Sequence, residues 1–202
     1  LAPNYDVCLC DVWGVVHNGE VSFPAACDAL MRVRDAGGTV VFITNAPRPG
    51  EAVMRQLDRR KVPRETCDAI VSSGDVTRHV IAERKGQTVL HIGPERYQSI
   101  FTGLDVQFAP LERGDYVVCS GLDDDDTQTP EDFRARLEIM RARNLFMVCG
   151  NPDLVVERGD RLVYCAGAIA ELYEKMGGEV LYAGKPYRPI YDLALAKAES
   201  LR

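Results

Sequence analysis

The sequence predicts an α/β protein with a doubly wound parallel sheet and an inserted α/β lobe. Short apolar segments alternate with amphipathic ones along most of the 202 residues, and several apolar segments end at a polar residue or a glycine. Alternation of this kind is typical of strands joined by helical crossovers, which make the strands parallel. The chain is long enough for one large core or two modest ones, so a core domain can carry an inserted lobe.

The first strand, helix and second strand are predicted near the N-terminus. Residues 5–10 form an apolar run that ends at Asp11, as expected of a buried strand with a carboxylate at its C-terminal end. Pro24 suits the first turn of a helix that stops at the glycine pair 37–38, and residues 39–44 form another apolar strand. A right-handed crossover makes these two strands parallel neighbours.

The same alternation continues along the rest of the chain. We expect helices over 49–60, 76–84, 130–143, 168–175 and 189–202, and strands over 69–72, 86–93, 116–120, 145–149 and 180–183. The third of these helices has the clearest start, because Thr129 can cap it and Pro130 suits its first position. On this pattern, residues 1–76 and 167–202 form a Rossmann-like core domain, and residues 77–166 form an α/β cap domain.

Composition and charge exclude several classes of protein. The net charge is −6 and no run of Lys and Arg could follow a phosphate backbone, so we expect no nucleic-acid partner. No apolar stretch is long enough to span a bilayer and no secretory signal is visible, which predicts a cytoplasmic protein without membrane attachment. The seven cysteines are odd in number and scattered, so we interpret them as reduced thiols. The oligomeric state stays open, a homodimer included.

Polar residues follow three of the predicted strands. Asp11 comes after the first strand, Thr44 and Asn45 close the second, and Lys185 follows the last. Taken singly, these residues have ordinary explanations as a loop cap, a turn and an exposed lysine. Because open α/β sheets bind ligands at the carboxyl ends of their strands, we expect the four side chains to meet there. A carboxylate nucleophile beside hydroxyl, amide and ammonium donors predicts a phosphate site.

Three motifs in this order resemble those of the haloacid dehalogenase superfamily. They read D-V-W-G-V-V-H-N-G-E at 11–20, F-I-T-N-A-P-R-P at 42–49 and A-G-K-P at 183–186. The spacing of the last two, together with G-N-P-D at 150–153, resembles the class-two (IIA, NagD-like) capped branch, and the similarity covers nearly the whole chain. The resemblance implies Mg²⁺-dependent hydrolysis of a small organic phosphate monoester through an aspartyl phosphate.

The resemblance also implies a role for each candidate residue. Asp11 corresponds to the nucleophile and to a magnesium ligand, and the backbone carbonyl of Trp13 corresponds to a second ligand. Thr44, with Asn45, and Lys185 correspond to the groups that bind the phosphoryl oxygens. The expected partner is therefore a small phosphorylated metabolite, with Mg²⁺ as the cofactor.

Other polar residues carry weaker signals. Asn151 and Asp153 lie where the cap returns to the core and could face the substrate, although N-P-D is equally an ordinary turn. The acidic run 123–126 lacks the glycine and the distant Glu of a calcium-binding loop, so we interpret it as a solvated loop. Arg48 and Arg161 could contact a second anionic group, but nothing in the sequence distinguishes them from surface arginines.

Two departures from the family pattern concern turnover. The family's phosphatases have a second Asp two residues after the nucleophile, which protonates the leaving oxygen, and Trp13 stands there. His17 is the nearest substitute for this acid, although loop histidines are commonly just exposed. The family's fourth motif, a strand ending in Gly-Asp, is not visible before Arg202, and we interpret it as missing sequence. The alternatives are a catalytically degenerate module that binds a phosphometabolite, or another phosphoryl or carbon–phosphorus chemistry.

Overall fold

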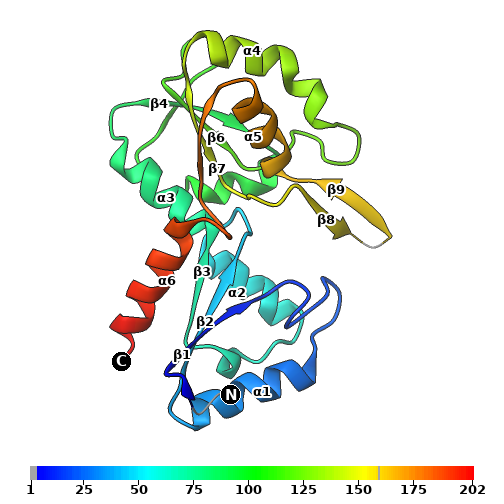
Figure 1. Cartoon of the computed structure of the whole chain (residues 1–202), viewed down its shortest axis with the longest axis vertical. Helices are drawn as coiled ribbons and strands as arrows, with labels where there is room; N and C mark the ends of the chain where they lie inside the picture. Colours follow the sequence, from blue (N-terminus) through cyan, green and yellow to red (C-terminus); the bar gives the residue numbers. More distant parts are fainter. Residues whose placement is uncertain (1–3, 159) are drawn as a thin grey trace.

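The computed structural model describes residues 4–158 and 160–202, and it has two lobes that are each built on a parallel sheet (Figure 1). The first lobe has three strands in the order β1, β2, β3, and the second has five in the order β10, β7, β6, β4, β5. The predicted α/β class with parallel sheets is confirmed. No helix in the described part of the chain is both long enough and apolar enough to cross a membrane.

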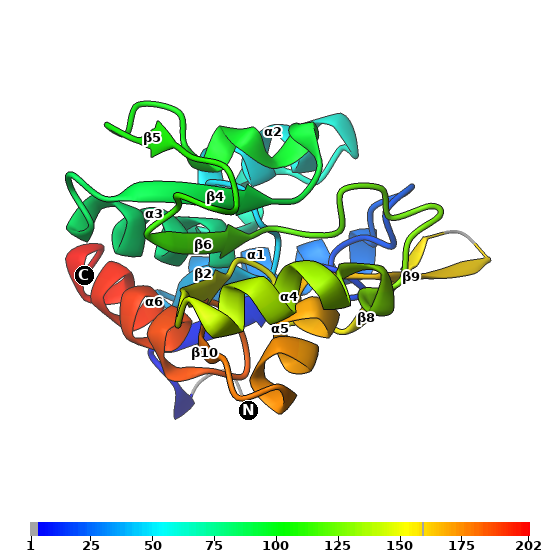
Figure 2. The same cartoon turned by 90° about the horizontal axis from the view of Figure 1, so that it is seen from above.

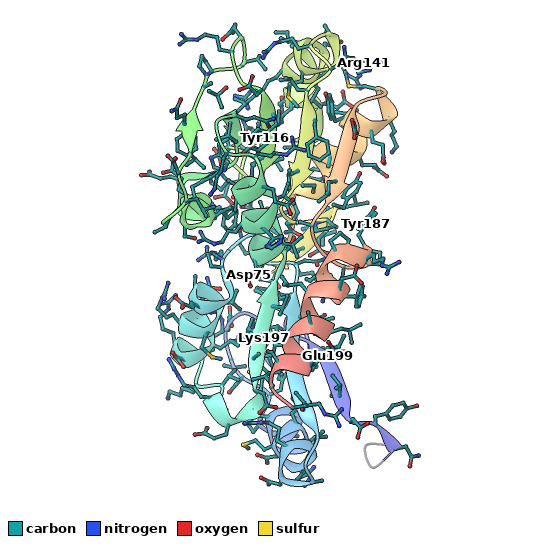
Figure 3. All side chains as sticks on the ribbon, turned by 90° about the vertical axis from the view of Figure 1, so that its left-hand side faces the viewer. Asp75, Tyr116, Arg141, Tyr187, Lys197 and Glu199 are labelled. Carbon is teal, nitrogen blue, oxygen red and sulfur yellow. The ribbon has the colours of Figure 1, made fainter. Side chains whose placement is uncertain are left out.

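The first lobe has helices on both faces of its sheet. Its elements are β1 (Val7–Asp11), α1 (Pro24–Asp35), β2 (Thr39–Thr44), α2 (Gly50–Arg59), the 3₁₀ turn η2 (Arg64–Thr66), β3 (Ala69–Ser72) and, from the end of the chain, α6 (Arg188–Ser200). Successive side chains of a strand point to opposite faces. Val40 and Phe42 therefore pack with α1 and α2, whereas Val41 and Ile43 pack with α6. Figure 3 shows α6 lying alongside β3.

The second lobe begins with α3 and contains most of the chain that follows it. Its elements are α3 (Ser73–Glu83), β4 (Thr88–Ile92), η3 (Glu95–Ile100), β5 (Gln107–Phe108), β6 (Tyr116–Cys119), η4 (Pro130–Phe133), α4 (Arg134–Ala142), β7 (Phe146–Cys149), α5 (Ala166–Lys175) and β10 (Glu179–Tyr182). Apolar residues of α4 and α5 share one cluster with the sheet, and the two helices lie together in Figure 2. The helix start predicted at Thr129 is present, because the Asp132 carboxylate accepts from the Thr129 N–H at 2.7 Å.

Residues 167–182 join the second sheet, whereas we expected them to return to the first. β10 pairs with β7 in parallel, from Glu179 opposite Phe146 to Tyr182 opposite Cys149, and α5 packs on the same two strands. The physical reason is that β7 is fully apolar and would otherwise form an exposed edge of the sheet. The chain returns to the first lobe only after Gly184, where α6 packs on β2 and β3.

A two-stranded hairpin was not expected from the sequence. It consists of β8 (Val155–Arg158) and β9 (Arg161–Tyr164), which pair antiparallel and project from the second lobe (Figures 1 and 2). Asp75 lies where the two lobes meet (Figure 3), and its carboxylate accepts from the Gly50 N–H at 3.0 Å and the Ser72 N–H at 3.0 Å. These bonds connect the start of α2 with the start of α3.

Candidate active site

A cavity of about 730 Å³ lies at the C-terminal ends of β1 and β2, with the hairpin β8–β9 forming part of its wall. The parallel register places Asp11 beside Ile43, so that Thr44 lies one residue beyond it at the same edge of the sheet. Nearly all of the predicted site residues line this cavity, namely Asp11, Trp13, Thr44, Asn45, Asn151, Asp153 and Lys185. His17 is the predicted residue that does not.

Asp11 and Lys185 form an ion pair although they are 174 residues apart in the chain. The Lys185 ammonium contacts Asp11 Oδ1, which also accepts from the Val12 N–H at 2.7 Å. The Asp11 side chain is 45% exposed and that of Lys185 is 19% exposed, so the carboxylate is the more accessible partner. The two bonds to Oδ1 fix the carboxylate at the C-terminal edge of the sheet.

Asn45 positions the Lys185 loop through two hydrogen bonds and makes a third to Asp153. Its side-chain oxygen accepts from the Lys185 N–H at 2.7 Å, and its amide nitrogen donates to the Lys185 carbonyl at 3.1 Å. The same nitrogen donates to Asp153 Oδ1 at 2.9 Å. The Asn45 side chain is therefore committed to protein partners, which leaves the backbone as the part of this residue that can meet a phosphoryl oxygen.

Gly184 is required at the contact between these loops. A Cβ at this position would lie 2.4 Å from Asn45 Oδ1, 2.8 Å from Pro152 Cδ and 3.0 Å from Ser73 Oγ. Gly184→Ala is therefore expected to lower the free energy of unfolding by about 1 to 3 kcal/mol, the usual cost of overpacking. Urea unfolding measures this loss. Gly121→Ala is the matched control, because its Cβ would approach no atom closer than 3.3 Å, and equal losses for the two variants would contradict the argument.

Thr44 and the loop before the hairpin provide further polar groups. Thr44 Oγ1 accepts from the Ala46 N–H at 3.3 Å, so the hydroxyl hydrogen can still be donated to a phosphoryl oxygen. The Asn151 side-chain oxygen accepts from the Asp153 N–H at 3.0 Å, which forms the ordinary turn that N-P-D indicates. Asn151 and Asp153 thus form a turn that also borders the cavity.

His17 holds the loop that follows β1 together. It is only 5% exposed, its Nδ1 accepts from the Gly19 N–H at 2.8 Å, and its ring meets Trp13 edge to face with centroids 5.2 Å apart. Burial lowers the pKa of His17, and the positive charge of Arg60 lowers it further, against the opposing charge of Asp11. The structure does not bring His17 to the cavity, so its placement gives no support to the acid/base hypothesis.

Replacing His17 by Asn is expected to make the free energy of unfolding less dependent on pH. The folded protein holds the pKa of His17 below 6.5, so the unfolded chain binds the proton more readily. The contribution of His17 to stability is therefore fully present above this value and is lost as the pH falls towards the pKa of the folded state. Asn can accept the Gly19 bond but cannot be protonated. Urea unfolding should show that the free energy of unfolding falls less in the variant than in wild type between about pH 7.5 and about pH 5.5. An equal fall in both proteins would contradict this role of His17.

The acidic run before η4 is exposed, as expected of a solvated loop, except at Asp125, and three of its four residues also form ion pairs with arginines. Asp125, with a side chain that is 10% exposed, binds Arg96 of η3 and also Arg158 of β8, the latter at 2.6 Å. Burial raises the pKa of Asp125, but the bond with Arg158 and the charges of Arg96 and Arg158 outweigh burial and hold the pKa below its usual range. Asp125 thus connects the hairpin to the body of the second lobe.

The ion pairs made by Asp125 could not be found from the sequence. Arg158 follows Asp125 by 33 residues, and nothing in their spacing indicates that the two side chains meet. The carboxylates of residues 124–126 lie within 4.8 Å of one another. Such clusters of carboxylates are common without a metal ion, and Arg96 and Arg158 already pair with Asp125, the least exposed of the three residues.

Comparison with known proteins supports a common fold. Residues 8–107 match the sequence model of haloacid dehalogenase-like hydrolases. A haloacid dehalogenase-like family hydrolase from Brucella suis shares 50% identity and a TM-score of 0.94, over all of this chain and 74% of that one.

Two further structures share the fold at lower identity. A 4-nitrophenylphosphatase from Thermotoga maritima is 21% identical with a TM-score of 0.76, over 100% of this chain and 76% of that one. A glycerol phosphate phosphatase from Mycobacterium tuberculosis, in complex with magnesium, is 24% identical with a TM-score of 0.75, over 98% of this chain and 60% of that one. A comparison with curated proteins returned no match.

Proposed function

The chain belongs to the haloacid dehalogenase-like hydrolases, and on this basis we propose that it hydrolyses a small organic phosphate monoester at Asp11. The observation that carries the proposal is the meeting of Asp11, Thr44 and Lys185 at one cavity, since a nucleophilic carboxylate, a hydroxyl and an ammonium are the groups that phosphoryl transfer needs. Phosphatases among the proteins that share the fold agree with this class of reaction.

Each of these residues has a distinct part in the proposed reaction. A carboxylate oxygen of Asp11 attacks phosphorus, forming an aspartyl phosphate and expelling the alcohol, and water then hydrolyses this intermediate. The Thr44 hydroxyl and the Lys185 ammonium hold the phosphoryl oxygens as negative charge moves onto them. Asn45 acts through Lys185, because two of its hydrogen bonds fix the backbone of the residue that carries the ammonium.

The oxygen atoms at the end of β1 fit a divalent cation. Asp11 offers a carboxylate oxygen besides the Oδ1 that contacts Lys185, and the backbone carbonyl of Trp13 is two residues away. Carboxylate and carbonyl oxygens are the ligands that Mg²⁺ prefers in proteins. Bound there, Mg²⁺ would neutralise negative charge on the phosphoryl group.

Trp13 limits proton transfer in the proposed reaction. An indole cannot donate a proton to the departing alcohol or take one from water at neutral pH. General acid/base help typically contributes about 10² to 10⁴-fold, so its loss slows turnover without abolishing it. We therefore expect substrates with acidic leaving groups to react fastest.

The test is phosphate release from a panel of sugar phosphates, nucleotides, pyridoxal phosphate and 4-nitrophenyl phosphate, with Mg²⁺ and with EDTA. Wild type should release phosphate from some of these, and the rate should fall with EDTA. Equal background rates for wild type and Asp11→Asn would overturn the proposal. The same result with ligand-induced thermal stabilisation would favour the binding module that Trp13 suggests, because a binder is stabilised without consuming its ligand.

The buried thiols support a cytoplasmic location. Burial raises the pKa of Cys10 to about 11 and that of Cys67 to about 12, so these thiols stay protonated at neutral pH. All seven cysteines are free, and six of them are buried, as expected of a protein that keeps its thiols reduced.

The net charge of −6 is unfavourable for binding nucleic acid, so we propose no nucleic-acid partner.

A further inference from the structure

The cavity around Asp11 is bordered by two arginines that lack an acidic partner. Lys185 is paired with Asp11, and the guanidinium groups of Arg96 and Arg158 are both paired with Asp125. Arg48 and Arg60 line the same cavity, yet no carboxylate of the described residues lies within ion-pair distance of either side chain. Charges that border a cavity without a protein partner are available to a ligand.

Arg48 is held in place by its backbone and by an aromatic ring. Its N–H donates to the Ala46 carbonyl at 2.8 Å, and its carbonyl accepts from the Ser72 hydroxyl at 2.5 Å. Gly74 packs against the same backbone, where a Cβ would approach within 2.3 Å. The guanidinium lies over the Tyr97 ring, 5.0 Å from its centroid, and this contact leaves the edge of the fork free to donate hydrogen bonds.

Arg60 approaches the cavity from the end of α2. Its Nε donates to the Gly19 carbonyl at 2.7 Å and Nη1 donates to the Gln56 carbonyl at 3.1 Å, so neutral acceptors fix the guanidinium without cancelling its charge. Gly19 lies beneath the Trp13 ring, since a Cβ there would be 2.7 Å from the ring edge.

The charge balance at Asp11 leaves these arginines available to another part of the substrate. Asp11, Lys185 and a divalent cation together balance a phosphate dianion, so the phosphoryl end requires no further positive charge. The carboxylates of Asp153 and Glu157 also line the cavity, but neither lies within ion-pair distance of Arg48 or Arg60. A substrate with a single anionic group at Asp11 would leave both guanidinium groups without a paired anion.

Resting on the proposed phosphatase function, we propose that Arg48 and Arg60 bind a second anionic group on the leaving-group side of the substrate, a carboxylate or a second phosphate. Arginine suits this role because its planar fork matches carboxylate and phosphate oxygens. The substrate is then a phosphorylated hydroxy acid or a bisphosphate, and Trp13 and Tyr97 border the space for the carbon chain between its two anionic groups.

The test compares substrates that differ only in the second anion. In 3-phosphoglycerate a carboxylate replaces the terminal alcohol of glycerol 3-phosphate, and fructose 1,6-bisphosphate adds a phosphate to fructose 6-phosphate. In at least one of the two pairs, wild type should have a kcat/KM about tenfold or more higher for the compound with two anionic groups than for its partner. Such a difference corresponds to one charge-assisted hydrogen bond. The preferred pair identifies the group as carboxylate or phosphate.

Variants of the arginines decide whether these residues cause the preference. Arg48→Gln and Arg60→Gln should each reduce the ratio of kcat/KM within the preferred pair by about tenfold, and Arg48→Lys should restore part of it. Arg161→Gln is the matched control, since Arg161 pairs with Asp126 at 3.0 Å outside the cavity wall. No preference in wild type, or an unchanged ratio in both variants, would overturn the inference.

A binding measurement keeps this inference distinct from the proposed function. Thermal stabilisation by the same four compounds reports binding whether or not phosphate is released. If neither these four compounds nor the wider panel is hydrolysed, the proposed function fails, and the inference stands or falls on whether the doubly anionic compounds stabilise wild type more than Arg48→Gln. If phosphate is released without discrimination, only the inference fails.

Discussion

Replacing Asp11 by Asn is expected to reduce phosphate release by about 10⁴-fold or more, because the amide cannot attack phosphorus and no second nucleophile replaces it. Asn has nearly the same shape as Asp, so the strand and the bond from the Val12 N–H can persist. The variant does lose the ion pair with Lys185, whose ammonium is then free to hold phosphate. We therefore expect Asp11→Asn to bind inorganic phosphate while failing to hydrolyse esters.

The measurement is steady-state phosphate release at saturating substrate, with circular dichroism to show that the variant is folded. Asp6→Asn is the matched control, because Asp6 lies just before the same strand, is largely exposed and makes a 3.5 Å ion pair with Arg202. Asp6→Asn should retain wild-type activity. A folded Asp11→Asn protein that keeps more than a small fraction of the wild-type rate would show that Asp11 is not the nucleophile.

Most strands and helices could be predicted because they carry a local signal. β2 reads as an uninterrupted apolar run and is buried along its length, and the amphipathic segments on either side of it become α1 and α2. The hairpin β8–β9 was missed because most of its residues are exposed or only partly buried, so neither strand shows a clear apolar face.

Which sheet a strand joins is not a local property. β10 follows a helix in the same way as strands of the first lobe do, and alternation alone could not assign it to β7. Pairing is decided by the apolar edge that the strand covers in three dimensions. For this reason the existence of residues 179–182 as a strand was predictable and their sheet was not.

The candidate site, too, could be predicted from the sequence only in part. Asp11 and Thr44 were predictable because the strand ends of one parallel sheet meet at one edge. Lys185 was expected to meet them for the same reason, but it follows β10 of the second sheet and is held beside Asp11 by the bonds between its backbone and Asn45. The bond of Asn45 to Asp153 was not predictable, because it joins the two lobes. The bond of Asp125 to Arg158 was not either, because it joins a loop of the second lobe to the hairpin, which the sequence did not predict. The same holds for Arg48, which only its neighbours distinguish from a surface arginine.

Replacing Trp13 by Asp is expected to raise kcat for substrates with poor leaving groups by about 10² to 10⁴-fold, the usual contribution of general acid/base catalysis. Trp13 lines the cavity with 46% of its surface exposed, so a carboxylate at this position can reach the departing oxygen or a water molecule. The backbone carbonyl of residue 13 is unchanged by the substitution. A gain rather than a loss of activity makes this result hard to attribute to damage of the fold.

The pattern across leaving groups identifies the cause of the gain. 4-Nitrophenolate leaves without protonation, so Trp13→Asp should accelerate 4-nitrophenyl phosphate less than an alkyl phosphate such as glycerol 3-phosphate. Trp13→Asn opens the same space without an acid, and it should not reproduce the difference. If Trp13→Asp and Trp13→Asn behave alike on alkyl phosphates, proton transfer does not limit this site, and the indole serves instead to border the substrate beside Gly19 and Arg60.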